Sequence, residues 1–179
     1  LLGTMTFLYG CKTWERNWDW KNDITLFLKD VETVPNSVLV LGNAGARYID
    51  LSDTKNFVAK REESLEKGIK YLKHAIELHP RYVNGYLNLG LGSYKLKRDR
   101  DALFYWKQAE YLYPNNPYLR NYYIVMYQDL LQRGFQKAQR GQLDSSIYEF
   151  RKTIILDKLN PEGFFQLGAA YYQNKQYDK

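Results

Sequence analysis

The apolar and polar positions of this chain recur mostly at the three-to-four-residue spacing of amphipathic helices. No segment alternates over a useful length with the period of two that a strand requires. Two of the helical runs end at Pro80 and Pro114, which lie 34 residues apart. Because proline lacks a backbone amide and restricts the residue before it, each marks the end of a helix. The pattern predicts an all-α fold in which a unit of 34 residues is repeated.

The segment between these prolines has large and small side chains in an order that lets two helices interlock. Gly90 and Ala102 would let the helix backbones approach closely, and Trp106 would fill the gap against the next repeat. One departure is Ser93, where the repeat pattern places a tyrosine that here follows as Tyr94. The order resembles a tetratricopeptide repeat, whose characteristic positions fall on Tyr86, Leu89-Gly90, Ala102, Trp106, Ala109 and Pro114. The resemblance implies a right-handed α-solenoid, a superhelix of stacked helical hairpins.

We expect the repeats to occupy residues 35–179, and two copies carry insertions. In the first copy Tyr48 and Gly68 are 20 residues apart, where the pattern needs about nine. Since the eleven extra residues make three helical turns, its second helix is expected to begin early, near Thr54. In the third copy residues 116–140 read as one long helix, with an Asn N-cap and proline at the first helical position. The expected copies are 35–80, 81–114, 115–160 and a partial copy at 161–179.

Residues 1–34 precede the repeats and are expected to form a membrane-proximal segment and an unpaired helix from Trp20 to Val34. Residues 1–10 are apolar, but about ten residues are too few for a membrane span, which needs roughly 18 to 20. The segment is either the outer end of a span or a helix that packs Leu1, Leu2, Phe7 and Leu8 against the first hairpin. The first interpretation is favoured by aromatic and basic residues of the kind found where a helix leaves the hydrocarbon: Tyr9, Lys12, Trp14, Arg16, Trp18 and Trp20.

The junction between this segment and the repeats has a more specific resemblance. It is similar to the junction in the transmembrane and tetratricopeptide-repeat-containing glycosyltransferase-like family, in which the last membrane span leads into repeats outside the cytoplasm. The resemblance implies an upstream membrane domain of the same protein that transfers sugar from a lipid carrier, and a periplasmic or lumenal location for the repeats. No catalytic residue carries over. The matching residues are Arg16, Asn17, Trp20, Thr25, Leu26, Phe27, Pro35, Asn36 and Ser37.

The composition and motifs argue against disulfides, metal sites and catalysis in this chain. One Cys cannot form an intramolecular disulfide, and with two His it cannot supply a zinc module. His74 and His79 are five residues apart, not the four that place two ligands on one helical face, so no metal site is expected. The glycine-rich stretch GYLNLGLG lacks the preceding strand and the spacing of a phosphate loop. With no nucleophile beside a base and no convergent carboxylates, we expect no catalytic residue, no cofactor and no enzyme activity here.

The net charge is +6, from 26 Lys and Arg against 20 Asp and Glu. This balance favours acidic partners without requiring nucleic acid. The basic run from Lys95 to Arg100 is interleaved with Asp99 and falls at an expected turn. We therefore expect either a solvated loop or a contact to anionic lipid headgroups there, and no nucleic-acid partner.

The expected binding site is the concave groove that first helices form in a repeat array. Asn43 and Asn88 stand at equivalent positions where an amide could reach a ligand backbone, or merely cap neighbouring polar groups. A mixture of Tyr, Leu and amide side chains suits a partly apolar peptide or partner helix. The lysine and asparagine clamp of chaperone-tail receptors is absent, because Leu87 and Leu91 hold those positions. The expected groove residues are Asn43, Arg47, Asn84, Leu87, Asn88, Leu91, Tyr94, Lys95, Tyr118, Asn121 and Tyr172.

These observations predict a non-catalytic scaffold for protein interactions that binds a protein or peptide ligand. It is expected to be the extracytoplasmic tail of a membrane glycosyltransferase-like protein. The alternative is a free cytoplasmic scaffold or co-chaperone-like adaptor unrelated to glycosylation.

Overall fold

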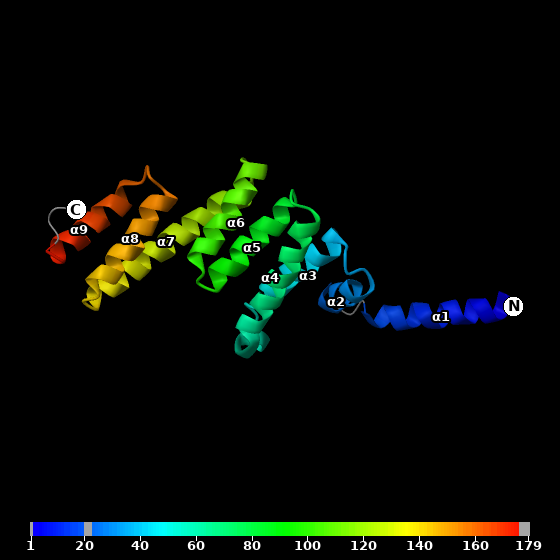
Figure 1. Cartoon of the computed structure of the whole chain (residues 1–179). Coiled ribbons are helices and arrows are strands. Elements are labelled where there is room, and N and C mark those ends of the chain that lie inside the picture. The colour runs from blue at the N-terminus through cyan, green and yellow to red at the C-terminus, as the bar shows by residue number, and fades with distance from the viewer. Residues whose placement is uncertain (1, 20–22, 176–179) are drawn as a thin grey trace. The chain divides into compact units, whose positions relative to one another are not determined.

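The computed structural model describes residues 2–19 and 23–175, where every regular element is a helix (Figure 1). Consecutive helices pair as the hairpins α3–α4, α5–α6 and α7–α8. The predicted all-α class, a solenoid type built from tetratricopeptide hairpins, is confirmed. In chain order the elements are α1 Leu2–Asp19, α2 Asp23–Thr33, α3 Val38–Leu51, the 3₁₀ helix η1 Lys55–Lys60, α4 Arg61–Leu78, α5 Val83–Lys95, α6 Asp99–Leu112, α7 Pro117–Gln139, α8 Leu143–Leu156 and α9 Pro161–Gln173.

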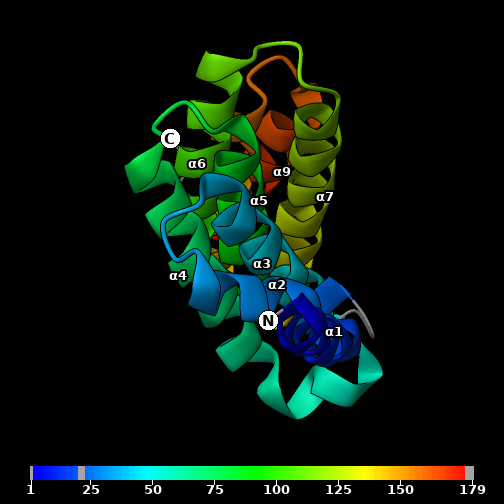
Figure 2. The ribbon, with the colours of Figure 1, turned by 90° about the vertical axis from the view of Figure 1, so that its right-hand side faces the viewer.

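The chain folds as two compact units, residues 1–116 and residues 117–179. In the first unit the α5–α6 hairpin packs on the α3–α4 hairpin, with α4 against α5 (Figure 2). Burial of one such apolar side chain stabilises a fold by roughly 1.5–3 kcal/mol, so the few core residues account for much of the packing energy between these hairpins. The core residues are Ile49, Leu65, Ile69, Leu72 and Leu89.

Glycines allow the helices of each hairpin to cross closely. A Cβ atom on Gly45 would lie 2.5 Å from Leu72 Cγ, and one on Gly90 would overlap the indole ring of Trp106. The Trp106 Nε1 group donates a hydrogen bond to the Leu87 carbonyl oxygen at 3.2 Å. The first helix of its own hairpin therefore accommodates the Trp106 ring.

The expected early start of the second helix near Thr54 is wrong. α3 ends at Leu51, and the hydroxyl groups of Ser52 and Thr54 donate to the carbonyl oxygens of Ile49 and Leu51 (2.6 and 2.9 Å). The extra residues then form the turn and η1, and α4 begins only at Arg61. Val58 of η1 is 69% exposed.

The second unit consists of the α7–α8 hairpin with α9 packed on α8. The predicted long helix is confirmed, since α7 runs from Pro117 to Gln139. The Asn160 side chain caps α9 by accepting a hydrogen bond from the Glu162 amide at 3.1 Å. The unit has its own apolar core, formed by Ile147, Phe150, Ala170 and Tyr171.

The backbone fixes the register of the repeats. Lys97, Gly141 and Lys175 each follow a first helix and have φ values of 60°, 73° and 56°. This left-handed conformation favours glycine and costs other residues about 1 kcal/mol or more. Lys175 follows Gly141 by 34 residues, but Gly141 follows Lys97 by 44. The third copy therefore carries ten extra residues, and they lie before the repeat proper, at residues 117–126.

A buried carboxylate joins the two helices of the α7–α8 hairpin. The side chain of Glu149 is 4% exposed, and its oxygens lie 2.5 Å from Lys137 Nζ, 3.0 Å from Lys152 Nζ and 3.9 Å from Arg133 Nη1. Burial by itself would raise the pKa of this carboxyl. The hydrogen bonds from Lys137 and Lys152 and the charge of Arg133 outweigh burial, so the pKa of Glu149 lies below its ordinary value.

The N-terminal helix α1 leaves large side chains in solvent. Phe7 is 73% exposed, so it does not pack against the first hairpin. Leu1 and the side chains of Leu2 and Leu8 lie outside the described residues, as does Trp20 at the expected start of the second helix. α2 packs against α3. Among the described helices, none is both long and apolar enough to cross a membrane.

Candidate functional site

Three asparagine side chains on the first helices of the first unit form what we call the amide surface: Asn43 on α3 and Asn84 and Asn88 on α5. Asn84 is exposed, and Asn43 and Asn88 are half-buried. Asn43 and Asn88 hold equivalent places, each two residues before a helix-crossing glycine, Gly45 or Gly90. Within the described part of the chain, none of the three amides is hydrogen-bonded to another residue. They can accept and donate hydrogen bonds to a partner.

Tyr82 closes the space beside the amide surface. A Cβ atom on Gly42 would overlap the Tyr82 hydroxyl group, and one on Gly85 would lie 2.7 Å from Tyr82 Cδ1. The ring thus lies over Gly42 of α3 and against the start of α5. Burial raises the pKa of the Tyr82 phenol. The sequence reasoning missed Tyr82, and the signal for it was the absence of a side chain at Gly42 and Gly85.

Two expected groove residues are engaged within the chain. Leu87 is 4% exposed and belongs to the core. The Lys95 ammonium group donates to the Ile49 carbonyl oxygen at 3.2 Å and lies 2.6 Å from the Asp53 carboxylate. Neither side chain can meet a ligand without rearrangement.

The remaining expected residues of the first unit frame the amide surface. Leu91 is partly buried against the core. The Tyr94 ring centroid lies 5.9 Å from that of Trp106, and the Lys97 ammonium group lies 5.5 Å from the Tyr94 ring centroid. The Arg47 guanidinium lies 3.7 Å from the Asp50 carboxylate and remains half-exposed. This frame is partly aromatic and partly apolar, and it includes the cations of Arg47 and Lys97.

In the second unit the expected register is shifted by ten residues. A Cβ atom on Gly134 would lie 2.7 Å from Phe150 Cδ1, so Gly134 is the helix-crossing glycine of this hairpin. Tyr118 and Asn121 therefore lie on the helix extension before the repeat, not at its groove positions. Both are exposed, as is Tyr172 on α9.

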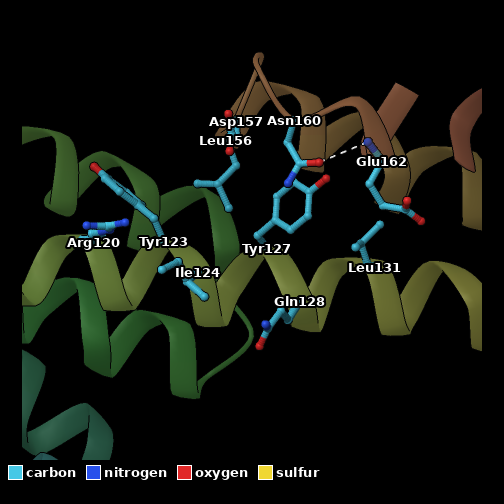
Figure 3. A pocket seen from close by; sticks show the side chains of 10 residues that line it. All are labelled: Arg120, Tyr123, Ile124, Tyr127, Gln128, Leu131, Leu156, Asp157, Asn160 and Glu162. Carbon is cyan, nitrogen blue, oxygen red and sulfur yellow. Dashed lines mark hydrogen bonds between the residues drawn. The ribbon is translucent and has the colours of Figure 1, made fainter. Parts of the chain in front are cut away.

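A cleft of about 580 Å³ lies within the second unit, between α7 and the turn from α8 into α9 (Figure 3). We call it the α7–α9 cleft. Tyr127 and Leu131 project from α7 toward the turn, and Asn160 faces Tyr127 from the other side. Its lining residues are Arg120, Tyr123, Ile124, Tyr127, Gln128, Leu131, Leu156, Asp157, Asn160 and Glu162.

The carboxylates of this cleft have no cation of their own. Among the described residues, neither Asp157 nor Glu162 is ion-paired. Asp157 Oδ1 accepts a hydrogen bond from the Leu159 amide at 3.0 Å, and Glu162 Oε1 accepts one from Gln166 Nε2 at 2.7 Å. Each carboxylate keeps a second oxygen, so the turn side of the cleft has two negatively charged hydrogen-bond acceptors.

Tyr127 forms part of the cleft wall, and its hydroxyl group is not placed to donate a hydrogen bond to a ligand. It is 9% exposed, and its hydroxyl group is buried near Thr153 and Gly163 without hydrogen-bond geometry to either. Burial raises the pKa of the Tyr127 phenol, and the charges of Asp157 and Glu162 raise it further. The negative charges of Asp157 and Glu162 thus both disfavour ionisation of the Tyr127 phenol.

Gln128, also an expected groove position of the third copy, lines the α7–α9 cleft, but the other expected groove residues do not, and the sequence did not single out this cleft. The available signal was the 16-residue spacing from Gly134 to Phe150, which equals that from Gly90 to Trp106 and sets the correct register. No group of three or more His, Cys, Asp or Glu side chains that could hold a metal ion occurs in the described parts of the chain.

Comparisons with known proteins extend these observations. The solved structure of MamA aligns with a TM-score of 0.43 and 20% identity, covering 92% of this chain and 84% of that one. No family model matches the sequence. Over 113 residues the chain is 29% identical to "Protein O-mannosyl-transferase TMTC3" of Mus musculus and 27% identical to that of Homo sapiens. These alignments cover 63% of this chain, which spans only 11% of the length of the relatives. The chain is a tetratricopeptide-repeat protein that resembles the repeats of these glycosyltransferase-like proteins, as predicted.

Proposed function

We propose that the chain is a non-catalytic interaction module that binds an extended segment of a partner protein on the amide surface of its first unit. The observation that carries this proposal is the state of Asn43 and Asn88. Both amides are partly accessible, occupy equivalent places on adjacent first helices, and have no hydrogen-bond partner among the described residues. The alternative role of these amides, capping neighbouring polar groups, has no such hydrogen bond to support it.

The partner that fits this surface is a partly apolar peptide. Amide side chains can pair with the N–H and C=O groups of an extended backbone, each such bond contributing about 0.5–1.5 kcal/mol. Leu39 is 66% exposed on α3, and Tyr94 and Leu91 are partly exposed on α5, so apolar side chains of the peptide would find contacts beside the amides. Leu87 and Lys95 are left out of the proposed contact set because they are engaged within the chain.

The experiment selects peptides from a displayed random library against the whole chain and then titrates one selected peptide. We expect Asn88→Ala to weaken binding about tenfold, the loss that corresponds to one or two amide hydrogen bonds. Tyr94→Ala removes contact area and should weaken binding as well. Asn115→Ala is the matched control, because Asn115 is an exposed amide in the turn after α6. Unchanged affinity in both test variants would remove the amide surface as the binding site.

We further propose that this module is the extracytoplasmic tail of a membrane glycosyltransferase-like protein and brings acceptor proteins or partner subunits to its membrane domain. The similarity to two proteins named O-mannosyl-transferases supports the link. So does the exposed aromatic helix α1, with Trp14 69% exposed. The open reading frame that encodes the segment tests the link. Several apolar spans upstream of Leu1 would support it, whereas a start codon shortly before Leu1 would favour a free cytoplasmic scaffold.

A further inference from the structure

We infer that the α7–α9 cleft binds an arginine or lysine side chain of an extended peptide. The cleft is separate from the amide surface, and it lies wholly within the second unit. Its partner is defined by the two carboxylates at one side and by the apolar wall along α7.

The carboxylates specify a cation. Asp157 and Glu162 both line the cleft, and neither is ion-paired among the described residues, although the chain as a whole carries a net charge of +6. Each has one oxygen engaged with the chain, which orients the carboxylate and leaves the other oxygen to accept a charge-assisted hydrogen bond. A guanidinium or ammonium group is attracted to these carboxylates, whereas a phosphate group would be repelled by them.

The rest of the wall suits the stem of a basic side chain. Ile124, Leu131 and Leu156 present apolar side chains to the cleft. The rings of Tyr123 and Tyr127 add aromatic surface, over which a cation is attracted by about 0.5–1 kcal/mol at an accessible site. Arginine and lysine pack a long methylene stem on such surfaces while the charged end reaches a polar partner.

Arg120 sets the direction in which the peptide lies. It is next to Tyr123, at the opposite end of the cleft from Glu162 (Figure 3). Its guanidinium would repel a second cation there and would favour a backbone carbonyl oxygen or an acidic side chain of the peptide. Asp157 lies between Arg120 and Glu162, so the basic side chain is placed between Asp157 and Glu162, away from Arg120 (Figure 3).

The inserted residues contribute part of one wall of the cleft. Arg120, Tyr123 and Ile124 all belong to the ten extra residues, 117–126, that lengthen α7 before the repeat proper. A hairpin of ordinary length would lack these three side chains. Insertions in repeat proteins commonly build binding surfaces in this way.

The test is a titration of the whole, isotope-labelled chain with an acetylated and amidated pentapeptide that has arginine between pairs of alanines. Backbone amide signals report the binding site. We expect saturable shifts at Tyr127, Asp157 and Glu162, and affinity about tenfold weaker for the same peptide with norleucine in place of arginine.

Variants of the chain separate the role of the charges from that of the shape. Asp157→Asn and Glu162→Gln each keep an oxygen for the hydrogen bond within the chain, so the fold should be preserved, as checked by an unchanged unfolding midpoint. The double variant should bind the arginine peptide about tenfold more weakly, and Asp144→Asn, an exposed carboxylate on α8 outside the cleft, should bind as the native chain does. Equal binding of the arginine and norleucine peptides, native-like binding by the double variant, or no shifts at the cleft would each overturn the inference. Variants of Asn88 and Tyr94 should leave this binding unchanged, so this inference and the proposed function of the amide surface are tested independently.

Discussion

Gly134 of α7 lies directly against the ring of Phe150 in α8, where a Cβ atom on the glycine would come within 2.7 Å of Phe150 Cδ1. The two residues are 16 positions apart, as are Gly90 and Trp106 in the preceding hairpin. This contact identifies the repeat register of the second unit. It also shows that residues 117–126 are an extension, which contributes part of one wall of the α7–α9 cleft.

Gly134→Ala should destabilise the chain, because the added methyl group must displace the Phe150 ring. Overpacking of this kind costs about 1–3 kcal/mol, partly offset by the better helix propensity of alanine, which contributes up to about 1 kcal/mol. Gly168→Ala is the matched control, since nothing lies within 4 Å of a Cβ atom there, and this variant should be neutral or slightly more stable. Urea unfolding of both variants checks the prediction, and equal stability of the two would contradict the assigned contact.

Lys97→Gly should stabilise the chain by about 0.5–1 kcal/mol, because φ is 60° at a position where glycine is less strained. Gly141→Ala should have the opposite effect, about 1 kcal/mol of destabilisation, although no atom would obstruct its Cβ. Thermal unfolding distinguishes the two. Changes of the same sign would show that the two turns are not equivalent.

Glu149→Gln should lower the free energy of unfolding by about 3 kcal/mol near neutral pH, because it leaves the cations of Lys137, Lys152 and Arg133 without their buried partner. The folded-state pKa of Glu149 is depressed, so its contribution is complete above the unfolded-state value of about 4.3 and disappears as the pH falls through the folded-state pKa. The difference between native chain and variant should therefore narrow below about pH 4.

Unfolding measured from pH 7 down to pH 3 checks this dependence. Glu63→Gln serves as the control, because Glu63 is an exposed carboxylate paired with Lys67 on the surface of α4 and should matter little. A difference that stays constant across this range would contradict the role given to the Glu149 charge.

The fold was largely predictable because its signals are local. The 34-residue spacing of Pro80 and Pro114, the Leu89-Gly90 pair and the Trp106 position place the best hairpin correctly. The register of the third copy was harder to predict, since Arg133 rather than leucine precedes Gly134. The tyrosines earlier in α7 also resemble the first-helix pattern of the repeat, but ten residues before its true position. Register there depends on a contact with Phe150 in another helix.

The sites were less predictable because they depend on which neighbours engage a side chain. Lys95 occupies a groove position of the repeat, but its pairing with Asp53 depends on where the turn after α3 runs. The extra residues after Leu51 became a turn and a 3₁₀ helix, which a count of helical turns could not reveal. Likewise, nothing in the sequence distinguishes Asp157 and Glu162 from other surface carboxylates, and only the folded structure shows that both line one cleft.

The most direct test of the proposed function is the affinity of a selected peptide for the chain that carries both Asn43→Ala and Asn88→Ala. If one extended peptide contacts both amides, each substitution should cost about tenfold, and the double variant should bind roughly a hundredfold more weakly than the native chain and the Asn115→Ala control. Native-like affinity of the folded double variant would contradict the proposal that the amide surface is the binding site.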